Sequence, residues 1–142
     1  MSSFLLDLQI QKDFKFYEFI TGTYNTMPIE CSLMALENLT EEVCHNIVKV
    51  SELAQEIRNH FNDSLIITCG FRPLAWELKQ GRTGKSLHAL GLAMDCYLSH
   101  IKLEDLFVWF NKRYTDKYGR AINKGLNFCH FDLRPNCVSW NY

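Results

Sequence analysis

Apolar side chains in the first half of the chain recur with the period of a helix that buries one face. Between residues 41 and 61 they fall at intervals of three and four, at Val43, Ile47, Val50, Ala54, Ile57 and Phe61. Thr40 stands just before this run and is followed by Glu41 and Glu42, which is typical of an N-cap with acidic residues in the first turn. The pattern therefore predicts a helix over residues 41–61.

The second half of the chain contains shorter apolar runs separated by turn residues. Residues 65–69 are the clearest of these and predict a central strand, because most of them are β-branched. The other expected elements are one or two helical turns at 74–79, a strand at 92–98, a helix at 103–117, and strands at 120–124 and 127–134. Helices that precede strands indicate an α+β fold, with a small antiparallel sheet packed against several helices. The 142 residues suit a single domain spanning residues 1–142.

Composition and charge narrow the classes of function. The net charge of −1 and the pI near 6.5 provide no basic surface of the kind that binds nucleic acid. No apolar run approaches the length of a membrane span, and the first residues lack a basic segment followed by an apolar core. We therefore expect a cytoplasmic monomer with no membrane partner. The six cysteines form no CxxC pair and are expected to be free buried thiols, with disulfides or metal ligation as the alternatives.

The stretch from Ser86 to Asp95, with the sequence SLHALGLAMD, carries the candidate chemistry. Two potential metal ligands, His88 and Asp95, lie seven residues apart in it. On a strand this odd separation puts them on opposite faces, and on a helix it puts them about 10 Å apart along the axis. Both side chains reach one ion only if the chain bends between them, and Gly91 adopts such a bend most readily. We therefore expect a loop that carries His88 and, beyond Gly91, a strand that carries Asp95.

The pattern SxHxxGxAxD in this stretch resembles the signature of the zinc D-Ala-D-Ala carboxypeptidases, peptidoglycan peptidases that include VanX-type dipeptidases and phage endolysin peptidases. The resemblance implies a fold like that of the D-Ala-D-Ala peptidases and hedgehog proteins, with one zinc ion. It also implies that His88 and Asp95 are zinc ligands and that a histidine from a strand near the C-terminus is the third. Ser86 matches a position that contacts substrate in the family, and its alternative role is to cap the loop that carries His88.

The last predicted strand supplies a candidate for the third ligand. Alternation along it puts one set of side chains on a polar face, namely Phe128, His130, Asp132 and Arg134. The HxD pattern resembles the C-terminal strand of the family, which implies that His130 completes the zinc set with His88 and Asp95. Three nitrogen and oxygen ligands with one open position are the arrangement of a catalytic zinc. Such an ion lowers the pKa of a bound water and polarises a carbonyl group.

Arg72 and Asp132 are the candidates for catalysis. Arg72 lies in Thr-Cys-Gly-Phe-Arg-Pro, which resembles the SGYR segment of the family and implies that Arg72 stabilises the oxyanion of the substrate. The alternative for Arg72 is an ion pair with an acid such as Asp132. Asp132 can act as the catalytic base, orient His130, or pair with Arg72 or Arg134. Orientation of His130 is the interpretation that we rank first.

The chain departs from the family at the general base. Relatives commonly carry a glutamate three residues before the last zinc histidine, whereas this chain has Asn127 there, and an amide cannot take the proton.

The sequence predicts a zinc-dependent peptidase that cleaves peptidoglycan stem or cross-link peptides, as a D-Ala-D-Ala carboxypeptidase or an endolysin-like endopeptidase of phage type. One alternative is a non-catalytic, zinc-stabilised binding or scaffold domain of the same fold. Another is a hydrolase that acts on a different dipeptide or small amide.

Overall fold

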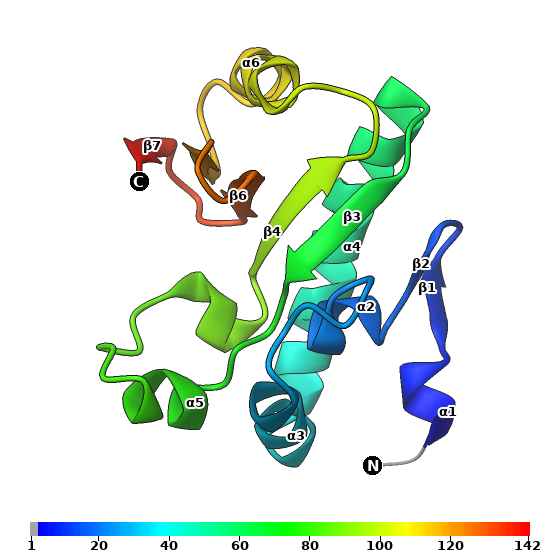
Figure 1. Cartoon of the computed structure of the whole chain (residues 1–142), viewed down its shortest axis with the longest axis vertical. Helices are drawn as coiled ribbons and strands as arrows, with labels where there is room; N and C mark the ends of the chain where they lie inside the picture. The colour runs from blue at the N-terminus through cyan, green and yellow to red at the C-terminus, as the bar shows by residue number, and fades with distance from the viewer. Residues whose placement is uncertain (1–2) are drawn as a thin grey trace.

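The computed structural model describes residues 3–142 as a five-stranded sheet with helices packed on it and a small separate hairpin (Figure 1). The helices are α1 (Ser3–Leu6), α2 (Glu18–Thr21), α3 (Ile29–Glu37), α4 (Glu41–Phe61), α5 (Leu74–Lys79) and α6 (Leu103–Arg113), and a 3-10 turn, η1, covers Leu87–Leu90. The strands are β1 (Gln9–Gln11), β2 (Phe14–Lys15), β3 (Leu65–Cys69), β4 (Ala93–Leu98), β5 (Gly119–Asn123), β6 (Phe128–Asp132) and β7 (Val138–Asn141). The predicted α+β class is confirmed. None of the described helices is long and apolar enough to cross a membrane.

Helix α4 has the bounds that the sequence predicted. The Thr40 side chain accepts a hydrogen bond from the backbone N–H of Val43 at 3.1 Å and so caps the first turn. Asn62 ends the helix in the left-handed conformation, with φ 47°. The helix crosses behind β3 and β4 in Figure 1, and its apolar face packs in the same core cluster as Ile67 and Met94 of those strands.

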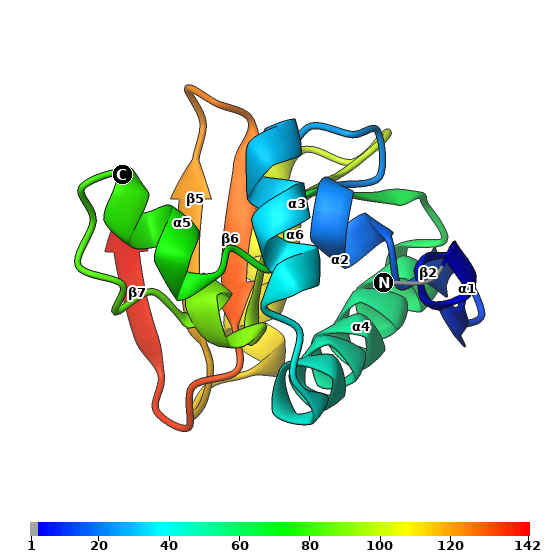
Figure 2. The ribbon, with the colours of Figure 1, turned by 90° about the horizontal axis from the view of Figure 1, so that it is seen from below.

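The five-stranded sheet has the order β3-β4-β6-β5-β7, and Figure 2 shows β6, β5 and β7 beside one another in that order. The pairs β3–β4, β4–β6 and β5–β6 are antiparallel, but β5 and β7 are parallel. The prediction of an antiparallel sheet is therefore wrong at this pair, and β7 itself was not predicted. The cause is the connection over residues 133–137, which leads from the end of β6 past β5 to its far side. Strand β7 therefore starts at the end of the sheet where β5 also starts.

Helix α6 ends at Arg113 rather than at the predicted residue 117. Tyr114 leaves the helical conformation, with φ −124° and ψ 82°. Its ring lies 4.8 Å from the ring of Phe110, and its hydroxyl donates a hydrogen bond to Glu56 of α4 at 2.6 Å. The hydrogen bond to Glu56 joins the end of α6 to α4, and the helical period of the sequence does not contain this contact.

Alternation along β4 and β6 gives the sheet one apolar face and one polar face. Met94 and Phe131 are fully buried on the apolar face, where the ring of Phe131 stacks on Phe110 of α6 with 3.9 Å between centroids. Asp95 and His130 follow and precede these residues in sequence and point to the opposite face. The core therefore lies between the sheet and helices α4 and α6, and the other face carries the candidate site.

Gly70 provides a test of how tightly the chain after β3 is packed. A Cβ atom at Gly70 would lie 2.3 Å from the carbonyl oxygen of Phe19, a backbone atom that cannot move aside cheaply. We expect Gly70→Ala to lower the free energy of unfolding by about 1–3 kcal/mol. Gly125→Ala is the matched control, because its nearest neighbour would be Asn123 Oδ1 at an ordinary 3.6 Å. Urea unfolding of both variants measures the difference, and equal stabilities would contradict the expected close approach.

Candidate metal centre

The register of the sheet places the candidate ligands in one row across the strands. Asp95 of β4 lies opposite His130 of β6 on one side and opposite Cys69 of β3 on the other. Directly opposite residues in an antiparallel pair have Cβ atoms about 4.5–5.5 Å apart, so their side chains are in reach of one another. His130 Nδ1 accordingly lies 3.0 Å from Asp95 Oδ1.

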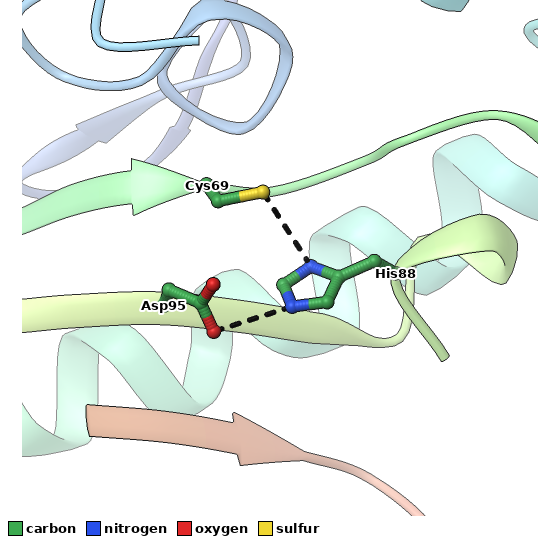
Figure 3. A group of neighbouring side chains, drawn as sticks. All are labelled: Cys69, His88 and Asp95. Carbon is green, nitrogen blue, oxygen red and sulfur yellow. Dashed lines mark hydrogen bonds and ion pairs between the residues drawn. The ribbon is translucent and has the colours of Figure 1, made fainter. Parts of the chain in front are cut away.

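The 3-10 turn η1 brings His88 to the same carboxylate. Ser86 Oγ accepts a hydrogen bond from the His88 backbone N–H at 3.2 Å and caps the turn, which is the alternative role that the sequence suggested for it. Gly91 ends the turn in the left-handed conformation, with φ 74°, as the predicted bend requires. His88 Nε2 lies 3.2 Å from Asp95 Oδ1, as Figure 3 shows. Two imidazoles thus meet at one oxygen of Asp95.

The hydrogen bonds behind the two imidazoles decide which nitrogens face Asp95 with a lone pair. His88 Nδ1 lies 2.7 Å from the carbonyl oxygen of Gly70, which only accepts, so Nδ1 carries the proton. His130 Nε2 lies 2.7 Å from Asp132 Oδ2, so a neutral His130 carries its proton on Nε2. The remaining nitrogens, His88 Nε2 and His130 Nδ1, then both direct lone pairs toward Asp95 Oδ1. A proton or a metal ion is needed at each of these two contacts, because a nitrogen lone pair and a carboxylate oxygen repel one another.

The donor set and its spacing fit zinc. Two ligands about 2.0–2.1 Å from a tetrahedral zinc ion are about 3.3 Å apart, which is close to the observed 3.0 and 3.2 Å between the nitrogens and Asp95 Oδ1. Each histidine also holds its second nitrogen on a carbonyl or carboxylate oxygen, the usual arrangement behind a metal-binding imidazole. The donor types and these two spacings, each measured to Asp95 Oδ1, are those that zinc takes.

Burial and charge act together on these three groups. His88, Asp95 and His130 are only 2%, 6% and 4% exposed. Burial by itself raises the pKa of Asp95, but the neighbouring His88 and His130 outweigh it and hold the pKa well below its usual range. Burial lowers the pKa of His130, but its hydrogen bonds with Asp132 and Asp95 raise it overall. Asp95 therefore stays an anion.

Cys69 offers a second donor set that the sequence did not predict. Donor atoms of Cys69, His88 and Asp95 all lie within 4.8 Å of one another. The Cys69 sulfur, however, approaches His88 Nδ1 at 3.9 Å, and this nitrogen already donates to the carbonyl oxygen of Gly70 (Figure 3). Burial also raises the pKa of the Cys69 thiol, which keeps it protonated in the metal-free protein. Cys69 and His130 are therefore the two candidates for the third ligand, and Cys69 belongs to the group whose donor atoms all lie close to one another.

Asp132 lies behind His130, where both of its oxygens are already engaged. Its side chain is fully buried and accepts hydrogen bonds from Arg134 Nε and Nη2, both at 2.7 Å, and from the Gly119 backbone N–H at 3.1 Å. The pairing with Arg134 was one of the expected alternatives, and the pairing with Arg72 does not occur. Burial opposes the charge of Asp132, but His130 and Arg134 lower its pKa overall. This arrangement suits a carboxylate that orients His130 better than one that takes a proton from water.

Arg72 pairs with an acid that sequence reasoning missed. Arg72 Nε donates to Glu77 Oε1 at 3.1 Å, and Arg72 Nη2 lies 3.5 Å from Ser86 Oγ. The Arg72 backbone N–H donates to the carbonyl oxygen of His88 at 3.0 Å, so the residue is joined directly to the turn that carries a ligand. Burial opposes the charge of Arg72, but the neighbouring Cys69, Glu77 and Asp95 together raise its pKa.

The family model for peptidase M15 matches residues 23–132. The chain belongs to the peptidase M15 family. Membership implies a zinc-dependent metallopeptidase with a peptide substrate, and the matched segment contains all three predicted ligands together with Arg72 and Ser86. Comparison with curated proteins and with solved structures found no match.

Strand β7 lies beyond the part of the chain that matches the M15 family, and it adds Trp140 to the site. Trp140 and His130 both lie opposite Ala121 of β5, whose small side chain leaves room for the indole to approach the imidazole. The two ring centroids are 5.0 Å apart, and the Arg134 guanidinium lies 5.1 Å from the Trp140 ring centroid. The alternation of Val138 and Trp140 with polar residues was the sequence signal for this strand.

Removal of single donors distinguishes the two possible ligand sets. We expect His130→Ala to weaken zinc binding by more than about 100-fold, because loss of a ligand exceeds the 10–100-fold effect typical of losing a group that orients one. Cys69→Ser is the matched control and is expected to keep the zinc affinity within about 10-fold. Titration of metal-free M15 protein against a competing zinc chelator gives both values. Zinc binding that survives in His130→Ala but not in Cys69→Ser would assign the Cys69 set instead.

The lowered pKa of Asp132 predicts how acid acts on the metal-free protein. A carboxylate whose folded pKa lies below its unfolded value, near 3.9, stabilises the fold above that pH and loses the effect as the pH falls through its folded pKa. We expect Asp132→Asn to lower the free energy of unfolding at pH 7 by about 1.5–3 kcal/mol. Its stability should also fall less steeply than that of the wild type between pH 5 and pH 3. Urea unfolding measures both, with substitution of the exposed Asp116 by Asn as the control. If the stability of Asp132→Asn fell with pH as steeply as that of the wild type, the lowered pKa of Asp132 would be contradicted.

Proposed function

We propose that this protein is a zinc-dependent peptidase that cleaves peptide bonds in peptidoglycan stem or cross-link peptides. The observation that carries the proposal is the convergence of His88 Nε2 and His130 Nδ1 on Asp95 Oδ1 in a member of the M15 family. Three protein ligands leave one position open, which is typical of a catalytic rather than a structural zinc. All three come from one chain, so a monomer suffices for the proposed activity.

The residues around the metal centre have separate parts in the proposed reaction. When bound to His88, Asp95 and His130, zinc supplies a Lewis acid that polarises the scissile carbonyl and acidifies water. Asp132 keeps His130 in the tautomer whose Nδ1 lone pair faces Asp95.

On the substrate side, Arg72 donates hydrogen bonds to the carbonyl oxygen as negative charge develops on it. Its Nε is already fixed on Glu77, so these bonds come from the terminal nitrogens of the guanidinium. Ser86 lies beside Arg72, at 3.5 Å from Nη2, and contacts the bound peptide.

The position of Asn127 favours a second candidate function, a non-catalytic domain that uses zinc for stability and binds a partner. Asn127 ends the turn between β5 and β6 in the left-handed conformation, with φ 57°, and its side chain is exposed. Asparagine tolerates this conformation better than glutamate does, so the turn itself accounts for the loss of the family's general base. With Asp132 fully engaged, the proton of the attacking water must pass to another acceptor, or the domain does not turn over.

Digestion of peptidoglycan by the zinc-loaded protein tests the two functions. We expect released fragments in mass spectrometry, and their composition separates loss of a terminal D-Ala, as from a carboxypeptidase, from endopeptidase cleavage of cross-links. Arg72→Ala should lower kcat by about 10²–10³-fold, because a donor to the developing oxyanion is lost. Its zinc content should remain that of the wild type. Full zinc occupancy without any released fragment would instead support the non-catalytic domain.

A further inference from the structure

We infer that Glu77 is a positioning residue for the proposed peptidase reaction. It fixes the Arg72 guanidinium beside the metal centre and so controls the rate without touching the substrate. This inference rests on the proposed function, because it assigns Arg72 to the developing oxyanion. Glu77 lies on α5, outside both the ligand pattern SxHxxGxAxD and the segment around Arg72.

The contacts of Glu77 show a carboxylate with both oxygens occupied by arginines. Its side chain is fully buried, with Oε1 at 3.1 Å from Arg72 Nε and Oε2 at 2.5 Å from Arg82 Nη1. Helix α5 begins directly after Pro73, and the Glu77 backbone N–H donates to the Pro73 carbonyl oxygen at 3.1 Å. This single helical turn brings the Glu77 side chain back under Arg72.

The hydrogen bond to Glu77 is made by Nε of Arg72. It therefore orients the guanidinium and leaves the terminal nitrogens available for the substrate. Glu77 takes the Nε–H, at the inner end of the planar group, and the side chain of Arg72 remains 23% exposed. Because the guanidinium is rigid and planar, one bond at Nε restricts the plane in which both terminal nitrogens lie. Without it, this long and flexible side chain would be ordered only when substrate binds.

The second arginine joins this pair to the loop that leads to His88. The Arg82 backbone N–H donates to the Glu77 carbonyl oxygen at 2.9 Å, in addition to the side-chain ion pair. The loop continues to Ser86, which caps η1 and lies next to Arg72. Burial of an unpaired carboxylate is strongly unfavourable, so the two arginine partners of Glu77 account for its presence in this position. Arg82 therefore balances the charge of Glu77, and the Nε bond to Arg72 is the contact through which Glu77 acts on the site.

Kinetics of a double-mutant cycle test the inference. Glu77→Gln keeps the shape of the side chain but removes its charge. We expect it to lower kcat by about 10–100-fold with KM and zinc content near wild-type values, because the donors to the oxyanion are misplaced. In an Arg72→Ala background the same substitution should change kcat by less than about 2-fold, because its target is gone. Arg82→Gln is the control, since it removes the other partner and leaves the Arg72–Glu77 pair intact.

The outcome that overturns the inference is a Glu77→Gln effect of equal size with and without Arg72. Glu77 would then act on the fold in general. Exchange of the Arg72 Nε–H with solvent, followed by NMR on 15N-labelled zinc-loaded protein, decides the matter without any activity. We expect exchange at least about 10-fold faster in Glu77→Gln than in wild type and in Arg82→Gln. Equal exchange rates overturn the inference. A protein that releases no peptide but shows this exchange difference would refute the proposed function alone.

Discussion

A single carboxylate oxygen, Asp95 Oδ1, organises the metal centre. It lies 3.2 Å from His88 Nε2 and 3.0 Å from His130 Nδ1, in a part of the molecule from which water is almost excluded. Lone pairs and negative charge repel one another strongly where the effective dielectric constant is low. The arrangement is stable only with a proton or a metal ion between the donors, and this requirement connects the fold of the M15 domain to its cofactor.

The groups behind the donors make this arrangement specific. The Gly70 carbonyl oxygen and the Asp132 carboxylate each fix one histidine tautomer, and Arg134 balances the charge of Asp132. Trp140 lies against His130 and comes from β7, a strand beyond the segment that matches the family. Since a ligating imidazole must be deprotonated at the ligating nitrogen, these outer contacts determine where the ion binds.

The site has two sides with different consequences for chemistry. Strands β4 and β6 carry the proposed ligands Asp95 and His130, and the Asp132 carboxylate behind them is paired with His130 and Arg134. On the other side, Glu77 of α5 holds Arg72 through its Nε. Arg72 lies beside Ser86, which caps η1. The turn that ends at Asn127 provides no acid, because its left-handed backbone favours asparagine. The acceptor of the water proton is the part of the proposed reaction that distinguishes the two functions.

The sequence by itself determined the long helix α4, the strand β3 and the bend at Gly91, because each depends on local period or backbone preference, and the ligand set stays a prediction from a spaced motif. Only the tertiary structure decided the parallel pairing of β7, the end of α6 at Tyr114 and the partner of Arg72. The positions of Cys69 and Trp140 beside the ligands also depend on strand register. Register and the pairing of buried charges are contacts between residues far apart in the chain, and a local pattern does not specify which of several acids or strands becomes the neighbour.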